Sequence, residues 1–295
     1  MPSVVGRFAP SPSGALHIGS LVAALGSFLQ ARAQGGRWLL RMDDLDTPRV
    51  EPGAAERILD ALVFFELRWD GEILYQDTRR DAYRLAIEHL KNAGQAFDCG
   101  CTRREARSGQ GGIEGPIYPG TCRGGLPPGR QARSVRFRVD GQCFTVADSV
   151  QGGYEQRLDR DIGDFVIRRA DGIVAYQLAT VLDDDYQGVT EVVRGADLLS
   201  STPRQIALQK ALGLDTPRYA HLPVIVDEAG EKLGKSTGAM PLRPEKPGAQ
   251  LAQCLHWLGQ CPPDSLWDAN ASHVLRWGLD NWSLDRVPKT PEAVA

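Results

Sequence analysis

Strand-like and helix-like segments alternate over the first part of this 295-residue chain, and this alternation restricts the possible folds most strongly. Each short apolar stretch is followed by a longer one whose apolar residues recur at helical spacing. Such an order is typical of a parallel sheet with crossover helices. The expected strands are residues 3–9 and 37–44, and the expected helices are 16–33, 52–67 and 78–94, the last with Thr78 as N-cap and Gly94 as its stop.

The alternation is interrupted in the middle of the chain. A glycine- and proline-rich stretch, 108–130, is followed by short strand-like segments, which include 164–169 and 172–179. Helix–strand alternation then returns. We therefore predict an α/β fold: a Rossmann-like nucleotide domain over residues 1–245, with halves 1–96 and 171–245 split by an insertion at 97–170, and a short helical C-terminal region over 246–295.

The charge distribution is uneven, although the net charge is only −3. Residues 101–139 carry eight arginines and two glutamates, so this segment is at +6 and the remainder at −9. A basic stripe of this kind attracts phosphates, and a solvated arginine-rich surface is the equally weighted alternative. No stretch approaches the ~20 apolar residues of a membrane span, and the N-terminus lacks signal-peptide features. The expected location is the cytoplasm, and the expected state is a monomer without membrane contact.

A turn rich in proline and glycine, residues 7–20 ("RFAPSPSGALHIGS"), joins the first strand to the first helix. Ligands of open α/β sheets bind at the carboxyl ends of strands, and a helix N-terminus favours an anion. We expect His17 to donate a hydrogen bond to a phosphate and Gly19 to allow close approach to the backbone. Taken alone, one histidine at a helix start is more often structural.

A second glycine-rich loop, "GEKLGKSTG" at 230–238, contains Lys232 and Lys235. Lysines in such a loop can close over a triphosphate and stabilise the charge that develops as pyrophosphate leaves. An exposed loop with solvated lysines is the alternative for this segment by itself.

Together, "PSPSGALHIGS" and "KLGKS" resemble the paired signatures of the class I aminoacyl-tRNA synthetases. "RFAPSPSG" is similar to the glutamyl members in particular, and "RMDDLD", "AYQLATVLDD" and "VTEVVRGADLLSSTPRQ" extend the likeness to residue 210. The resemblance implies a ligase that activates L-glutamate with ATP and Mg²⁺, with His17, Lys232 and Lys235 as catalytic residues and with His17, Gly19 and Lys235 at the ATP. Gly234 stands where serine is commoner in the family.

The chain continues for only about sixty residues after "KLGKS", too few for an anticodon-binding domain, so none is expected. A chain of this design resembles the glutamyl-Q tRNA(Asp) synthetases over essentially its whole length. That resemblance implies transfer of glutamate to queuosine, at the wobble position of tRNA(Asp). The alternatives are ordinary charging of a tRNA 3′ end, a non-catalytic tRNA-binding relative, and a small-molecule nucleotidyltransferase.

A site for glutamate needs fixed positive charge for its side-chain carboxylate and a carboxylate for its ammonium. Arg7 and Arg194 are the candidates for the first role and Asp43 for the second, while Tyr176 can supply a hydroxyl. The resemblance implies these residues for the family's amino-acid site, with Phe8, Ala9, Pro10 and Ser11 beside Arg7, and with Asp43 where the family usually has glutamate. Purely structural ion pairs are the alternative.

Three cysteines, Cys99, Cys101 and Cys122, have a spacing compatible with a structural zinc site, which needs four ligands. No histidine lies between residues 90 and 220, so the residues leave Tyr118, Cys143 or a carboxylate as the fourth ligand. Free reduced thiols are the alternative. The family resemblance implies Cys99, Cys101, Tyr118 and Cys122 as the ligands of one structural zinc ion.

Overall fold

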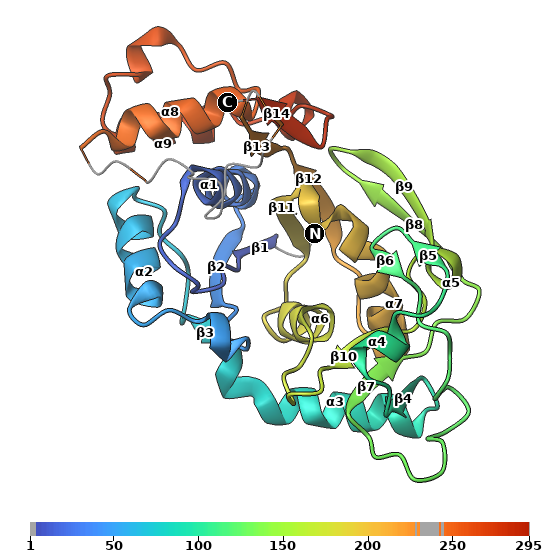
Figure 1. Cartoon of the computed structure of the whole chain (residues 1–295). Helices are drawn as coiled ribbons and strands as arrows, with labels where there is room; N and C mark the ends of the chain where they lie inside the picture. The colour runs from blue at the N-terminus through green and yellow to red at the C-terminus, as the bar shows by residue number, and fades with distance from the viewer. Residues whose placement is uncertain (1–3, 228, 231–241, 243–244, 295) are drawn as a thin grey trace.

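A parallel sheet lies at the centre of the computed structural model, which describes residues 4–227, 229–230, 242 and 245–294 (Figure 1). Two hydrogen bonds of Thr190 join its two halves, since Thr190 N donates to Val5 O and the Thr190 hydroxyl oxygen accepts from Val5 N, both at 2.9 Å. Strand order reverses at this junction, where open α/β sheets bind their ligands. The strands are β3 (Leu74–Tyr75), β2 (Arg37–Met42), β1 (Val5–Phe8), β11 (Glu191–Gly195) and β12 (Arg218–Leu222).

Helix α1 (Ile18–Ala33) packs on the sheet at close range. A Cβ atom on Gly26 would lie 2.5 Å from Leu222 Cδ1, so a larger residue at this position would displace the Leu222 side chain. Figure 1 shows α1 between the sheet and the C-terminal helices. The other helices of the two sheet-forming halves are α2 (Ala54–Phe64), α3 (Arg80–Asn92), α6 (Tyr176–Tyr186) and α7 (Thr202–Leu212), and the short 3₁₀ turns there are Thr47–Arg49, Gln76–Arg79 and Ala196–Ser201.

Two local predictions are wrong. Residues 172–179 do not form a strand: α6 begins at Tyr176, because Leu178 and Val181 supply helical spacing toward the core and outweigh the β-branched start of the segment. Thr78 is not an N-cap, since a 3₁₀ turn precedes α3, Arg79 holds the cap position and the Thr78 hydroxyl donates to Tyr75 O at 2.6 Å. Gly94 does follow the helix end and has φ +71°, as its role as a stop requires.

The segment between the two halves of the sheet helps to form a second core, together with residues of α3, α6, α7, β11 and β12. This second core includes Phe137, Phe165 and Leu178 and is separate from the larger core around α1. Strand β8 (Cys143–Asp148) also reaches the central sheet, where Asp148 pairs in parallel with Tyr219 of β12. The remaining elements are β4 (Ala96–Cys99), β7 (Ser134–Phe137) and β10 (Phe165–Arg168), antiparallel in the order β10-β7-β4, the hairpins β5 (Gly111–Gly112)–β6 (Gly115–Pro116) and β8–β9 (Gly152–Arg157), and the short helices α4 (Arg103–Ala106) and α5 (Leu158–Asp161).

The end of the chain packs on α1, with Leu251, Leu255 and Val274 in the same core as Leu21 and Leu25.

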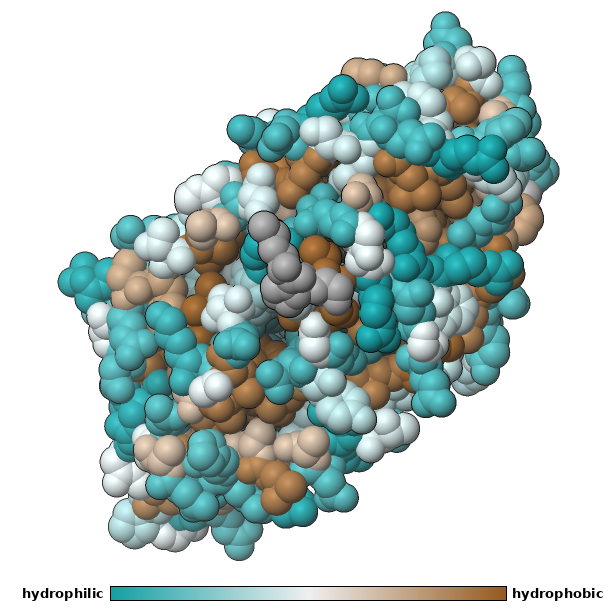
Figure 2. Space-filling view, turned by 180° about the vertical axis from the view of Figure 1, so that it is seen from behind, coloured by the Kyte–Doolittle hydropathy of each residue, from teal (hydrophilic) through white to brown (hydrophobic). Residues whose placement is uncertain are grey.

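The face seen from behind the view of Figure 1 is largely hydrophilic, with apolar groups gathered in a few patches (Figure 2). Among the described residues, no helix combines the length and apolar character needed to cross a bilayer. The last elements are β13 (Val224–Val226), α8 (Pro247–Trp257), α9 (Ala271–Asn281), β14 (Glu292–Val294) and the 3₁₀ turns Asp264–Leu266 and Leu284–Arg286.

Candidate active site

A cavity of about 810 Å³ lies at the carboxyl ends of the central strands. Phe8, Gly195 and Leu222, the last residues of β1, β11 and β12, all line it. The turn after β1 closes one side. The predicted site residues that line the cavity are Phe8, Ala9, Pro10, Ser11, His17 and Gly19, whereas Lys232 and Lys235 lie outside the residues that the structure describes.

His17 is the N-cap of α1, and its Nδ1 accepts a hydrogen bond from Ser20 N at 3.3 Å. A ring nitrogen that accepts carries no proton, so the proton of the neutral imidazole is on Nε2. The backbone N–H groups of the first turn of α1 lie at the same end of the helix as the Nε2–H donor of His17. The turn therefore combines a side-chain donor with the positive end of a helix dipole, an arrangement that suits a phosphate.

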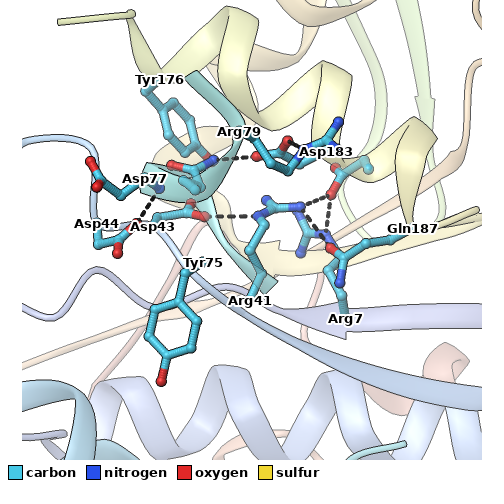
Figure 3. A network of polar contacts seen from close by, with 12 residues as sticks. Arg7, Arg41, Asp43, Asp44, Tyr75, Asp77, Arg79, Tyr176, Asp183 and Gln187 are labelled. Atoms are coloured by element: carbon cyan, nitrogen blue, oxygen red, sulfur yellow. Dashed lines mark hydrogen bonds and ion pairs between the residues drawn. The ribbon is translucent and has the colours of Figure 1, made fainter. Parts of the chain in front are cut away.

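Arg7 lies on β1 and is buried. Its Nε donates to Asp184 Oδ1 on α6 at 3.2 Å, and this is the guanidinium's one hydrogen bond to a described residue. Asp184 Oδ1 also accepts from Arg41 Nη1 at 2.6 Å, and Arg41 Nε donates to Asp43 Oδ1 at 2.8 Å. Figure 3 shows Arg41 with Asp43 on one side and Gln187 on the other. Two predicted pocket residues, Arg7 and Asp43, are thus joined through one buried ion-pair network.

The protonation of this network follows from its burial and its arginines. Burial raises the pKa of Asp43 to about 6, although Arg41 opposes the shift. Burial acts in the same direction on Asp184, but Arg7 and Arg41 outweigh it and hold the pKa of Asp184 below its ordinary value. Both carboxylates are therefore charged at neutral pH. Asp43 is also held close to the turn, because its N–H donates to Pro10 O at 3.0 Å.

Arg194 and Tyr176 form the second group of predicted pocket residues. Arg194 Nη1 donates to the Tyr176 hydroxyl at 3.4 Å, and Nη2 donates to Thr202 Oγ1 at 2.9 Å and Gln205 Oε1 at 2.8 Å. Arg194 is buried, while Tyr176 is 38% exposed and accessible to a ligand. Tyr176 and Asp184 both belong to α6, so this helix contributes to both groups.

Two residues that sequence reasoning missed, Arg41 and Asp184, connect the first group. Arg41 could have been found, because it is two residues before Asp43 on a strand and side chains two apart share a face. Asp184 had a weaker signal: it is one of three consecutive aspartates in a helix whose core-facing residues include Leu178 and Val181. Its neighbour Asp183 is also buried and accepts from Arg79 Nε at 2.7 Å and the Tyr83 hydroxyl at 2.7 Å.

The three predicted cysteines converge. The sulfur atoms of Cys99, Cys101 and Cys122 all lie within 4.8 Å of one another, and all three residues are buried. The Tyr118 hydroxyl is 3.4 Å from Cys99 Sγ and 3.5 Å from Cys101 Sγ. Burial raises the pKa of the Cys99 thiol, but hydrogen bonds from Tyr118 and its neighbours outweigh this and lower it to about 7. Three thiols and a phenol at such distances could hold a four-coordinate metal ion, and the exposed Cys143 is not part of the cluster.

Comparison with known proteins identifies the family to which this fold belongs. A family model described as "tRNA synthetases class I (E and Q), catalytic domain" matches residues 3–244. The crystal structure of a glutamate tRNA ligase from Elizabethkingia meningosepticum in complex with its amino acid superimposes with a TM-score of 0.82 at 26% identity, covering 99% of this chain and 67% of that one. The fold and these matches thus define a class I ligase of the aminoacyl-tRNA synthetase type.

Sequence relatives narrow the assignment within this class. The chain is 53% identical over 293 residues to a glutamyl-Q tRNA(Asp) synthetase from Chromobacterium violaceum, covering 97% of this chain and 96% of that one. It is likewise 53% identical over 287 residues to a glutamyl-Q tRNA(Asp) synthetase from Dechloromonas aromatica, with 96% and 95% covered. The chain belongs to the family of glutamyl-Q tRNA(Asp) synthetases.

Proposed function

We propose that this chain activates L-glutamate with ATP and Mg²⁺ and transfers the glutamyl group to queuosine at the wobble position of tRNA(Asp). The observation that carries the proposal is a juxtaposition at one edge of the sheet. The helix N-terminus with His17 lines the cavity there, and the Arg7–Asp43 and Arg194–Tyr176 groups stand on the adjoining strands and on α6. Family membership supports the same reaction.

The substrate glutamate would be held by charges on both sides. Arg7 and Arg194 take its carboxylate groups, Asp43 takes the ammonium, Tyr176 adds a hydroxyl, and Phe8 to Ser11 form the wall. Among the described residues, Arg7 hydrogen-bonds only through Nε, so the two Nη atoms are left to bind a carboxylate in the forked manner typical of arginine. Asp43 is charged at neutral pH, as ammonium binding requires.

Activation needs no protein nucleophile, since the α-carboxylate of glutamate attacks the α-phosphorus of ATP directly. The protein positions the reactants and stabilises the charge on the phosphates. We assign this role to His17 and Gly19 at the start of α1 and to Lys232 and Lys235, with Mg²⁺ bound to the phosphates. Nε2–H of His17 is the donor that this assignment uses.

The RNA substrate would approach over an arginine-lined hollow of about 620 Å³ beside the cysteine cluster. Its arginines are Arg103, Arg107, Arg133, Arg136 and Arg169. The hollow adjoins the cavity, because Asp46 pairs both with Arg169 at 3.1 Å and with Arg49, a cavity residue, at 2.7 Å. Such arginines would contact RNA phosphates, which supply affinity and orientation but little sequence specificity.

We propose that different segments of the chain have different roles in this reaction. Residues 1–245 form the catalytic domain, in which halves 1–96 and 171–245 bind ATP and glutamate and the insertion 97–170 contacts RNA. Residues 246–295 support it by packing on α1.

We also propose that Cys99, Cys101, Tyr118 and Cys122 hold one structural zinc ion. Protein purified without added metal is expected to contain about one zinc per chain by elemental analysis, and Cys122→Ser is expected to lose most of it, because a ligand is removed from a four-coordinate site. Cys143→Ser, which changes an exposed cysteine outside the cluster, is the matched control. Full zinc retention by Cys122→Ser would contradict the assignment. Loss of zinc should reduce transfer to RNA more than adenylate formation.

Glutamate-dependent ATP–pyrophosphate exchange tests the activation step. Exchange is expected with glutamate and ATP alone, without tRNA, because every group assigned to activation belongs to this chain. Aspartate and glutamine serve as control substrates, since the first is one methylene shorter and the second lacks the side-chain charge. Exchange that began only when tRNA was added would show that the pocket is incomplete without RNA.

A further inference from the structure

Two buried residues outside the assigned pocket, Asp148 and His221, form a hydrogen-bonded chain that ends at Arg194. We infer that Asp148 and His221 are positioning residues, which orient the Arg194 guanidinium toward the amino-acid substrate. The inference rests on the proposed function, because that proposal places Arg194 in the glutamate pocket.

The geometry fixes the role of each atom in this chain. Arg194 Nε lies 3.0 Å from His221 Nε2. A guanidinium can only donate, so Nε2 accepts and the proton of the neutral imidazole is on Nδ1. Nδ1 in turn lies 2.6 Å from Asp148 Oδ2, to which it donates. Asp148 thereby selects the one neutral tautomer of His221 that can accept from Arg194.

Asp148 is itself held firmly. Its Oδ1 accepts from the backbone N–H groups of Val150 at 3.0 Å, Gln151 at 2.8 Å and His221 at 3.1 Å. The side chains of Asp148 and His221 are both fully buried. The carboxylate therefore has little freedom to rotate, and it fixes the plane of the imidazole beside it.

The contacts of Arg194 leave Nη1 as the least engaged nitrogen of its guanidinium. His221 occupies Nε, and Thr202 and Gln205 occupy Nη2, whereas the described contact of Nη1 is the 3.4 Å one to the partly exposed Tyr176 hydroxyl. Nη1 and Tyr176 together face the place where the proposal puts glutamate. Because two sides of the fork are anchored, the direction of Nη1 depends on the His221 contact.

The residues around His221 favour the neutral imidazole, whose Nε2 accepts the hydrogen bond from Arg194. The groups that face it are Asp148 from β8, Arg194 from β11, Thr202 from α7 and the ring of Tyr219, which stacks with its centroid 6.1 Å away. Burial lowers the pKa of His221, and the charge of Arg194 acts in the same direction against the opposing Asp148. Since Asp148 belongs to β8, the segment between the two sheet-forming halves contributes to the amino-acid pocket.

A matched pair of variants separates the two contacts of the imidazole. The amide of His221→Asn occupies the place of Nδ1 and keeps the Asp148 bond but has no acceptor for Arg194. The longer amide of His221→Gln places an oxygen near Nε2 and keeps an acceptor for Arg194. In pyrophosphate exchange we expect His221→Asn to raise KM for glutamate by about tenfold or more while KM for ATP stays within about twofold, and His221→Gln to recover most of the loss. Tyr219→Phe, on the same strand, removes a hydroxyl whose hydrogen-bond partner among the described residues is Gln209, and it should change neither constant.

The tautomer provides a second test on the unaltered protein. Nitrogen-15 NMR of histidine-labelled protein is expected to show His221 neutral and protonated on Nδ1. A proton on Nε2, equal KM values for glutamate in His221→Asn and wild type, or equal losses in both variants for glutamate and ATP would each overturn the inference. Absence of glutamate-dependent exchange in the wild type is a different result, because it contradicts the proposed function itself.

Discussion

Replacement of Arg7 by alanine is expected to lower kcat/KM for glutamate in ATP–pyrophosphate exchange by about two to three orders of magnitude, the range measured when one partner of a buried charge pair is truncated. Among the described residues, the Nη atoms of the buried Arg7 make no hydrogen bond, so they can bind a substrate carboxylate. Arg7→Lys should recover only part of the loss, because an ammonium cannot bind a carboxylate through two parallel hydrogen bonds.

The control must separate substrate binding from stability, because Arg7 also pairs with Asp184 on α6. Arg79→Ala is well matched: it removes a comparable ion pair with Asp183, the preceding residue of the same helix, and Arg79 has no assigned substrate contact. Both variants should lower the melting temperature, but only Arg7→Ala should raise KM for glutamate. Similar kinetic losses in the two variants, or a loss shared equally by glutamate and ATP, would assign Arg7 a structural role only.

Local signals in the sequence predicted the part of the fold in which we propose the phosphate site. The first strand and the helix after it were expected from periodicity, and the structure places them at Val5–Phe8 and Ile18–Ala33 with His17 as the cap. The prediction of a strand at residues 172–179 is wrong because the apolar and β-branched start of this segment is compatible with a strand or a helix. Contacts of Leu178 and Val181 with the core stabilise the helix.

The cysteine cluster could be predicted because ligand chemistry restricts spacing as well as residue type. The ion-pair network could be predicted only in part. Arg41 and Asp184 are 143 positions apart, and Asp148 and His221 are 73 apart, so their contacts exist only after the strands have been placed in one sheet. Individual residues of the network have local signals, but the sequence alone does not show which of these distant residues pair.

The second large effect concerns the acceptor. Glutamate is expected to be transferred to queuosine-containing tRNA(Asp), with no detectable transfer to the same tRNA that lacks queuosine. The arginine-lined hollow beside the cavity offers contacts to RNA phosphates, which are the same in both tRNAs and cannot distinguish them. Discrimination must then come from a base that is accessible in a single-stranded loop, where proteins read RNA sequence, and the modified base supplies the attacking hydroxyl.

The most direct test charges tRNA(Asp) with labelled glutamate in four forms: with or without queuosine, and with the 3′-terminal ribose intact or oxidised. The oxidation by periodate is done on tRNA that still lacks the modified base, and the base is introduced afterwards, because periodate would also cleave the diol of queuosine. Our account predicts label on both queuosine-containing forms, located in the anticodon loop after nuclease digestion, and none on the two forms that lack queuosine. Charging of unmodified tRNA that is abolished by 3′ oxidation would contradict it and would establish an ordinary tRNA-charging enzyme instead.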